Sequence, residues 1–451
     1  MRAGSRRGVR YGGLDSVVRW TPGGIVGVGG AFGCSRGAVS DRKGASVGVD
    51  ERQLVDERLE TLLTSYPPES TPEAELWGAQ FDHGLAWVQF PEGLGGLGVS
   101  PRWQAVVDDA INAAGGTTRN RALNVLGIGM GAGTIVAHGS EEHQRRFLRP
   151  MFTCEEIWCQ LFSEPGAGSD LAALATSAKR DGDHWIVNGQ KVWTTLAHVA
   201  KWGMLVTRTD PDVAKHAGLT YFIVDMEADG VDVRPLYQIT GQAEFNEVYF
   251  DDVHIPDDLR LGDVGQGWNV AMTTLMNERV AIGARIEPRG GGSIGLAVEA
   301  WDRVRREGHD DPATRDRLLG YWAEAEALRL TTLRAKEAAT VGTPGPEGST
   351  AKLHWADLNK AITSFTVDLL GAEGMLFPGG YTFGRPDVVS LDAEHRRAPQ
   401  TPHKAYLRAR ANSIEGGTSE IMKNILGERV LGLPGEPRVD KNVPWREVPR
   451  S

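Results

Sequence analysis

The feature that most constrains the fold of this chain is that its hydrophobic period changes twice. Apolar residues first recur at helical spacing, as in Val55, Leu59 and Leu62. After Pro165, roughly 100 residues read as short strands separated by turn residues. From Gly267 onward the helical spacing returns. Strands and helices do not alternate, which excludes a Rossmann-type parallel sheet and predicts a multidomain α+β protein.

The expected domains follow from these changes of pattern. Long helices joined by short loops favour a four-helix bundle in the last part, and short strands favour a small barrel or sandwich in the middle. The predicted parts are an extension (1–48), an N-terminal α domain (49–157), a β domain (158–265), a C-terminal α bundle (266–435) and an extended tail (436–451).

Residues 1–45 differ in composition from the rest of the chain. They are rich in glycine and basic residues, but no continuous apolar segment or small-residue cleavage site follows the basic residues. We therefore expect a disordered extension. A basic targeting peptide is the alternative, and the sequence leaves open whether this segment belongs to the functional protein.

Local patterns predict the individual elements. The expected helices are 50–64, 101–114, 120–138 and 140–152, the last beginning at Ser140. The expected strands after the first hairpin are 203–207, 219–226, 231–236 and 245–250. Within His184–Trp193, two β-rich arms flank Asn188-Gly189, which is the strongest short signal for a hairpin turn.

Composition excludes several classes of protein. The chain has 451 residues and a net charge of −10, so nucleic acid is not an expected partner. Its only cysteines are Cys34, Cys154 and Cys159, too few for a disulfide framework or a thiolate metal site, and no metal is expected. No apolar run is long enough for a membrane span. A reducing cytoplasm is the expected location.

One glycine-rich turn, Ser163–Asp170, stands at the start of the β region. Its sequence is Ser-Glu-Pro-Gly-Ala-Gly-Ser-Asp, and we call it the cradle turn. Glycines allow successive backbone N–H groups to point into one concavity, which suits a phosphate or pyrophosphate. The alternative is a surface turn with a capping Ser or Asp.

Several motifs, taken in order, resemble those of the acyl-CoA dehydrogenase family. They are Phe90–Gly98, His138–Glu142, the cradle turn, Asn188–Thr195 and Gly417–Ile421. The resemblance extends over about residues 50–435 and identifies the subgroup that has glycine at the usual C-terminal catalytic Glu position. It implies an α domain, a β domain and a four-helix α domain, FAD as cofactor, and α,β-dehydrogenation of an acyl-CoA thioester.

The resemblance also implies site residues. Those expected to contact FAD are Gln160, Phe162, Ser163, Ser169, Trp193, Thr194, Thr195, Thr418 and Glu420; those expected to contact the substrate are Ser169, Met276, Arg279 and Gly417. An aromatic face, hydroxyl donors and a glycine turn suit the flat ring, polar edge and diphosphate of a flavin. For Trp193 alone, a buried core aromatic is the alternative.

The catalytic base has two candidates. The family commonly has Glu directly before the Gly-Thr of its C-terminal motif, but here Gly416 occupies that position and Glu415 is displaced by one residue. Some family members carry the base on the first long helix of the C-terminal domain, immediately before an Arg. Glu278-Arg279 matches that arrangement, so Glu278 is the preferred base and Glu415 the less favoured one. An exposed Glu278 in a surface ion pair is the alternative.

Two departures from the family leave the assembly open. The Arg-x-x-Phe-Gly motif that reaches FAD in a neighbouring subunit is missing, and Asp368 replaces the Gln of a later motif. Expected partners are an acyl-CoA of medium-to-long or bulky chain, an electron-accepting flavoprotein, and either further copies in a homodimer or tetramer or a related chain in a heteromer. The alternatives to an active dehydrogenase are a non-catalytic subunit of a heteromeric complex and an oxygen-using oxidase or monooxygenase.

Overall fold

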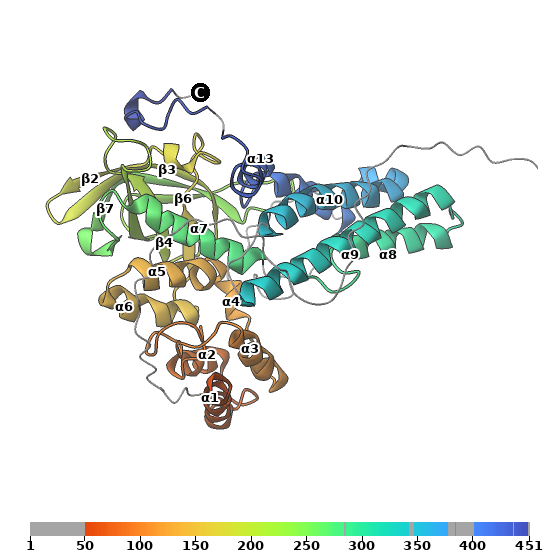
Figure 1. Ribbon diagram of the computed structural model, residues 1–451, viewed down its shortest axis with the longest axis horizontal. Helices are drawn as coiled ribbons and strands as arrows, with labels where there is room; N and C mark the ends of the chain where they lie inside the picture. The colour runs from red at the N-terminus through yellow and green to blue at the C-terminus, as the bar shows by residue number, and fades with distance from the viewer. Residues whose placement is uncertain are drawn as a thin grey trace, which may run out of the picture. The chain divides into compact units, whose positions relative to one another are not determined.

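The computed structural model divides the chain into two units, Met1–Gly48 and Val49–Ser451, and describes residues of the second. The predicted extension over 1–48 therefore lies outside the described residues. Within the second unit the order is helices, strands, helices, as predicted (Figure 1). The described residues are 50–283, 286–341, 347–377, 384, 401–435 and 437–449, without the side chains of 278–283, 339–341 and 347.

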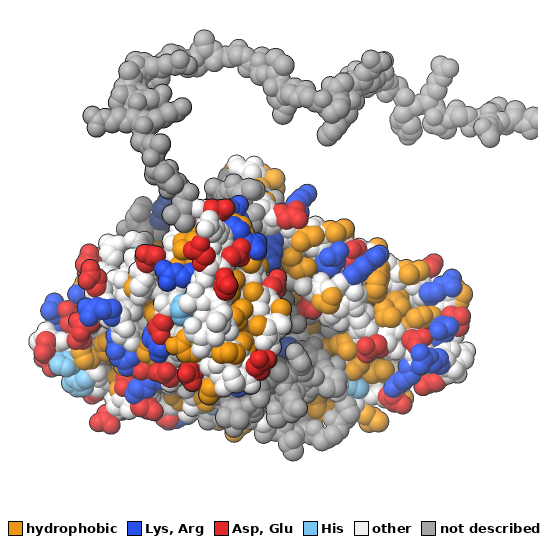
Figure 2. Space-filling view, turned by 90° about the horizontal axis from the view of Figure 1, so that it is seen from below, with side chains coloured by type: hydrophobic (Ala, Val, Ile, Leu, Met, Phe, Trp, Pro, Cys, Tyr) orange, Lys and Arg blue, Asp and Glu red, His pale blue; other side chains and the backbone are white. Residues whose placement is uncertain are grey.

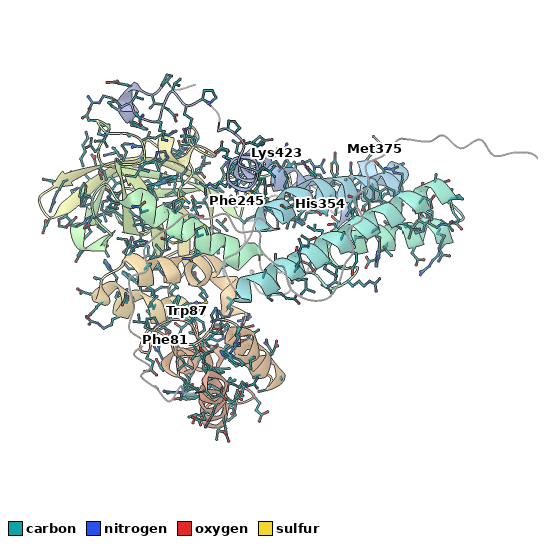
Figure 3. The ribbon with its side chains drawn as sticks, viewed as in Figure 1. Phe81, Trp87, Phe245, His354, Met375 and Lys423 are labelled. Carbon is teal, nitrogen blue, oxygen red and sulfur yellow. The ribbon has the colours of Figure 1, made fainter. Side chains whose placement is uncertain are left out.

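The N-terminal part is helical. Its elements are α1 (Glu51–Ser65), α2 (Glu73–Asp82), α3 (Trp103–Ala113), α4 (Asn120–Leu123), the π-helical turn η1 (Gly127–Gly131), α5 (Ala132–His138) and α6 (Glu141–Phe152). Asp50 caps α1, and Ser140 with His143 forms a capping box at the start of α6. Figure 3 labels Phe81 and Trp87 of the apolar core, whose rings meet edge to face at 6.2 Å. The predicted helix over 120–138 exists but is interrupted by η1.

The middle part is one mixed sheet of eight strands. The strands are β1 (Trp158–Leu161), β2 (Ser177–Asp181), β3 (His184–Thr195), β4 (Trp202–Arg208), β5 (Leu219–Asp225), β6 (Val231–Pro235), β7 (Phe245–Pro256) and β8 (Arg260–Leu261). Their order is β6-β7-β3-β2-β4-β5-β8, with β1 parallel to β4. The β region is therefore confirmed.

The two faces of β4 and β5 serve different cores. Leu205 and Phe222 pack with Trp185 and Val253 of the opposite half of the sheet, so the sheet folds over its own apolar interior. Met204 belongs instead to the core shared with the helices. Alternate residues of a strand point to opposite faces, which explains why every residue of β4 is buried.

The predicted hairpin at Asn188-Gly189 is wrong. β3 continues through both residues, and the hairpin that joins β2 to β3 turns at Gly182, where φ is +62°. At Gly189 the pairing of β3 with β7 shifts register, and a Cβ there would lie 2.5 Å from the Thr176 hydroxyl. The glycine thus permits a bulge and a close contact, rather than a turn.

The C-terminal part is helical again. Its elements are α7 (Gly267–Gly283), α8 (Ser293–Arg306), α9 (Pro312–Val341), α10 (Glu347–Leu369), η4 (Gly371–Met375), α12 (Pro402–Ala409), η5 (Arg410–Ser413), α13 (Ser419–Asn424), η6 (Ile425–Val430) and η7 (Trp445–Glu447). α8, α9 and α10 share a core that includes Trp301, Ile362 and Phe365, whereas α7 packs mainly on η1, α5 and β5.

The outer surface of these helices carries apolar side chains. Leu319 and Leu330 on α9 and Trp355 on α10 are 56%, 50% and 41% exposed. Figure 2 shows such side chains among the charged ones toward the right of the view. Among the described residues, no helix has the length and apolar character that a membrane crossing requires.

Candidate active site

The cradle turn reverses the chain directly after β1. Glu164 and Ala167 exchange two backbone hydrogen bonds, each 3.0 Å long. A Cβ built on Gly166 or Gly168 would meet nothing within 4 Å, and Ser169 is exposed. The turn therefore presents backbone and a hydroxyl to open space, as a ligand-binding turn requires.

A buried ion pair holds the first end of the turn. The Glu164 carboxylate lies 2.8 Å from the Lys191 ammonium and accepts the backbone N–H groups of Ala175 and Thr176 at 2.6 and 2.9 Å. Burial alone would raise the pKa of the Glu164 carboxyl, but the charge of Lys191 and these hydrogen bonds outweigh burial and keep that pKa below its usual value. Glu164 is thus a structural anion.

A second lysine holds the other end. The Lys215 ammonium donates to both carboxylate oxygens of Asp170, at 2.8 and 2.7 Å, although the Lys215 side chain is only 2% exposed. It also pairs with Asp440, which belongs to the predicted tail. Both carboxylates of the turn, Glu164 and Asp170, are therefore paired with a lysine.

Gln160 and Phe162 lie just before the turn, and Ser163 begins it. Gln160 lies in β1, and the buried Phe162 ring meets Tyr221 edge to face at 5.9 Å. The carbonyl of Ser163 accepts the Val192 N–H at 2.9 Å. This bond joins the cradle turn to the end of β3, where the next predicted site residues lie.

Trp193 and Thr194 lie near the end of β3, in the segment that is predicted to contact the flavin. Trp193 has φ +61° and is 57% exposed, with its ring edge to face on Phe245 at 5.8 Å. The alternative of a buried core aromatic is wrong for this side chain. Thr194 is 1% exposed, and its hydroxyl has no hydrogen-bond partner among the described residues. An exposed indole beside an unsatisfied hydroxyl and an open glycine turn is the donor set that a flavin would satisfy.

Helix α7 carries the preferred base by position. Met276 is half exposed, and the side chains of Glu278 and Arg279 lie outside the described residues. The backbone of α7 continues through both positions to Gly283. Residue 278 follows the buried Thr274 by four positions and Leu275 by three, so it shares their helix face.

Polar contacts fix α7 against the N-terminal helices. The Thr274 hydroxyl bonds to those of Thr134, at 2.9 Å, and Tyr221, at 3.1 Å. His138 Nε2 lies 2.8 Å from the Thr273 hydroxyl, and burial lowers the pKa of this histidine. The sequence did not predict these contacts, because they join residues that are 53 to 140 positions apart in the chain.

Asn277 shows how closely α7 approaches these helices. Its amide donates to the carbonyl of Met130 at 3.3 Å. A Cβ on Gly133 would lie 2.6 Å from the Asn277 amide nitrogen, so a larger residue there would displace the Asn277 side chain.

The C-terminal motif is a tight turn before α13. Gly416 and Gly417 have φ +60° and +91°. The Thr418 hydroxyl caps α13 by accepting the Ile421 N–H at 3.1 Å, while Glu420 is exposed. Successive left-handed residues favour glycine, which agrees with glycine at both positions.

Glu415 is engaged by a cation. Its two carboxylate oxygens accept from the Arg408 guanidinium at 2.9 and 2.7 Å, and Asn412 donates to one of them at 2.8 Å. The charge of Glu244 also acts on Arg408, and the Glu244 carbonyl accepts the Leu196 N–H.

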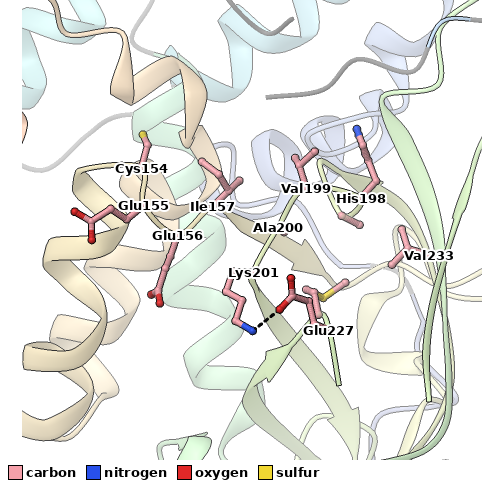
Figure 4. Close-up of a pocket in the computed structure, with 12 residues that line it drawn as sticks. Cys154, Glu155, Glu156, Ile157, His198, Val199, Ala200, Lys201, Glu227 and Val233 are labelled. Atoms are coloured by element: carbon pink, nitrogen blue, oxygen red, sulfur yellow. Dashed lines mark hydrogen bonds and ion pairs between the residues drawn. The ribbon is translucent and has the colours of Figure 1, made fainter. Parts of the chain in front are cut away.

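A hollow of about 750 Å³ opens beside the loop after β3 (Figure 4). It is lined by 154–157, 197–201, Met226, Glu227 and Val233, and so by none of the predicted site residues. Lys201 at its rim is paired with Asp225 and Glu227. Burial raises the pKa of the Cys154 thiol to about 12, so this thiol is not a ready nucleophile.

Comparison with known proteins agrees with this geometry. Family models described as the N-terminal, middle and C-terminal domains of acyl-CoA dehydrogenase match residues 50–155, 159–253 and 265–431. A relative from Mycobacterium tuberculosis, acyl-CoA dehydrogenase IpdE1, is 38% identical over 375 residues, which are 82% of this chain and 90% of that protein.

Solved structures share the fold. The ChsE4-ChsE5 complex from Mycobacterium tuberculosis matches with a TM-score of 0.61 and 26% identity, over 87% of this chain and 100% of that one. A structure titled Tcur3481-Tcur3483 steroid ACAD matches with a TM-score of 0.63 and 24% identity, over 86% of this chain and 98% of that one. The predicted α, β, α architecture is confirmed.

Proposed function

This chain belongs to the acyl-CoA dehydrogenase family and is an FAD-dependent enzyme, and from that premise we propose that Glu278 removes the α-proton of its acyl-CoA substrate. The bound flavin supplies the acceptor for the β-hydride. The observation that carries the assignment is that Glu415, the other candidate base, is paired with an arginine. The two carboxylates of the cradle turn, Glu164 and Asp170, are each paired with a lysine.

A general base needs a lone pair that is free to accept the substrate proton. Both oxygens of Glu415 accept from Arg408, and the hydrogen bond from Asn412 occupies a further lone pair. Proton abstraction by Glu415 would first break a two-point contact with an arginine that is always charged. Glu415 is therefore better suited to hold α12 against the turn before α13.

Residue 278 lies on α7, four positions after the fully buried Thr274 and three after Leu275. This spacing predicts that residue 278 continues a buried helix face, where a carboxylate would be partly desolvated and better suited to act as a base. The hydroxyl contacts of Thr274 with Thr134 and Tyr221 hold this turn of α7 in position against α5 and β5.

The predicted cofactor contacts keep their roles in this proposal. Gln160, Phe162, Ser163 and Ser169 line the flavin from the β1 side, Trp193, Thr194 and Thr195 from the end of β3, and Thr418 and Glu420 from the C-terminal motif. Thr194 is the most specific of these, because its buried hydroxyl has no hydrogen-bond partner among the described residues and a bound ligand would supply one. Met276, Arg279 and Gly417 remain the proposed substrate contacts, together with Ser169.

The substrate is proposed to be an acyl-CoA of medium-to-long or bulky chain, and the electron acceptor a second flavoprotein. The test is to purify the chain, measure FAD per chain, and follow flavin absorbance without oxygen while acyl-CoAs of increasing size are added. We expect bleaching by a subset of them. Glu278→Gln should keep FAD and lose bleaching by about 10²–10⁴-fold. Normal bleaching by this variant would contradict the assignment.

A heteromeric assembly is a second candidate for how the enzyme works. Support comes from the likeness to the ChsE4-ChsE5 complex, and from Asp368, which is exposed on α10 where the family has Gln. A carboxylate beside a diphosphate is unfavourable, so a related chain would complete the cofactor site there. Full FAD content in a homo-oligomer purified alone would contradict this candidate.

A further inference from the structure

The last described segment, residues 437–449, lies on the β domain, and we call it the C-terminal strap (Figure 1). The strap packs along the loop that joins β4 to β5. Pro444 forms a β-bridge with Ala214, and the backbone N–H of Trp445 donates to the carbonyl of Val213 at 2.8 Å. The strap contains one short helical turn, η7, and its backbone contacts hold it against this loop.

The side chain of Trp445 anchors the strap near the cradle turn. Its indole N–H donates to the carbonyl of Ala173 at 3.1 Å, and the Arg208 guanidinium lies 4.6 Å from the ring centre. Arg208, which is 3% exposed, donates in turn to the carbonyls of Ala172 and Lys215 at 2.5 and 2.7 Å. One network therefore connects the strap with the short helix that directly follows the cradle turn.

A chain of charges connects the strap to the turn itself. Asp440 pairs with the buried Lys215, which binds both oxygens of Asp170. Arg438 completes the cluster by donating to Asp440 at 3.3 Å. Lys215 is the only cation that the described contacts give to Asp170, and burial of an ammonium is tolerated only when it is paired.

We propose that the C-terminal strap positions the cofactor-binding turn: Asp440 holds Lys215 in place, Lys215 holds Asp170, and Ser169 is thereby fixed beside it. The inference rests on the proposed binding of FAD by this turn. It goes beyond the family assignment, because the matched family ranges end at residue 431. The strap therefore lies outside the ranges that the family models match.

The strap would order the cradle turn before a ligand binds, which is a form of preorganisation. Gly166 and Gly168 have no neighbours that would confine them, so the turn has conformational freedom that a ligand must remove. Fixing Asp170 from behind removes part of that freedom before the ligand arrives. Loss of Asp440 would leave Lys215 with one partner that is 54% exposed, and would loosen the turn without touching the ligand.

The test compares Asp440→Asn with two matched variants in the full chain. Asp440→Glu keeps the charge, and Lys441→Gln changes the exposed neighbour on the strap. The readouts are the FAD dissociation constant, from fluorescence titration of the apoprotein, and amide hydrogen exchange over residues 164–175. We expect Asp440→Asn to weaken FAD binding about tenfold, the effect of one lost charge-assisted hydrogen bond, and to speed exchange. The other two variants should stay within about twofold of wild type.

Unchanged FAD affinity and unchanged exchange in Asp440→Asn would overturn the proposal. If wild type itself binds no FAD, the proposed cofactor site fails, and the exchange measurement alone decides whether the strap fixes the turn. If Asp440→Asn does not fold, Trp445→Phe takes its place with the same expected direction, because it loses the indole N–H donor to Ala173 and alters the ring surface against Arg208.

Discussion

The two ends of the cradle turn are held by the same chemistry at different depths. At the first end, Glu164 and Lys191 have side chains that are 8% and 0% exposed. At the second end, Asp170 is 54% exposed, Lys215 is 2% exposed, and Asp440 arrives from the far end of the chain. The first pair is part of the interior of the β domain, whereas the second lies where interior meets solvent.

This difference in burial gives the two ion pairs different roles. Removal of one partner from a fully buried pair leaves a charge that is poorly solvated, so the first pair makes a large contribution to the stability of the domain. The partners of Lys215 can be solvated, so the second pair can vary without loss of the fold. At the second end, therefore, the C-terminal strap can change how firmly the cradle turn is held without affecting the fold.

The largest effect is expected from Lys191→Met. The buried Glu164 would lose its cation and keep only its hydrogen bonds, so unfolding free energy should fall by about 3–5 kcal/mol. Chemical denaturation measures this. Lys179→Met, at an exposed position of β2, is the control and should change stability by no more than about 0.5 kcal/mol. Equal effects of the two variants would break the comparison.

Lys215→Met should cost less, about 1–3 kcal/mol, because Asp170 and Asp440 remain accessible to water after the cation is removed. The same denaturation experiment measures it. The comparison is sharpened if this variant also shows faster amide exchange over 164–175, since the turn would lose its second anchor. A loss as large as that of Lys191→Met would show that the two ends are equivalent.

Acid should release the second end through Asp440. Hydrogen bonds from Lys215 and then Arg438 hold the pKa of the Asp440 carboxyl well below its usual value. A lowered pKa contributes stability that is present above the unfolded pKa of about 4 and is lost as pH falls toward the folded pKa. The drop in unfolding free energy from pH 6 to pH 3 should therefore be smaller in Asp440→Asn than in wild type. Parallel curves would contradict this.

The smallest effect is expected from Glu415→Gln. Glu415 and Arg408 are each about one-third exposed, so loss of this ion pair should cost no more than about 1 kcal/mol. Flavin reduction by acyl-CoA should continue at a rate near that of wild type. Thermal unfolding and anaerobic absorbance measure the two quantities on one sample, and a large loss of reduction would move the base from α7 to the C-terminal motif.

The sequence predicted what local chemistry determines. Helices α1 and α6 were foreseen because their caps and apolar spacing lie within one segment. Asn188-Gly189 was misread because its signal is also local, whereas pairing of β3 with β7 decides the conformation there.

Candidate site residues were predicted by motif, but their roles in packing were not. Nothing in the sequence connects Lys215 with Asp440, because 225 residues separate them and a single charge has no periodicity. The orphan hydroxyl of Thr194 was likewise invisible until the fold buried it. The Lys191 of Asn188-Gly-Gln-Lys was the one available signal, since a lysine inside a β-rich run requires an anion.

Exchange of the substrate α-proton distinguishes most directly between Glu278 on α7 and Glu415 in the C-terminal motif as the base. An acyl-CoA without hydrogen on its β-carbon is incubated in D₂O with FAD-loaded wild type, Glu278→Gln or Glu415→Gln, and deuterium at the α-carbon is followed by mass spectrometry. The account predicts exchange by wild type and Glu415→Gln, and a rate about 10²–10⁴-fold lower for Glu278→Gln. Exchange that survives in Glu278→Gln and disappears in Glu415→Gln would contradict it.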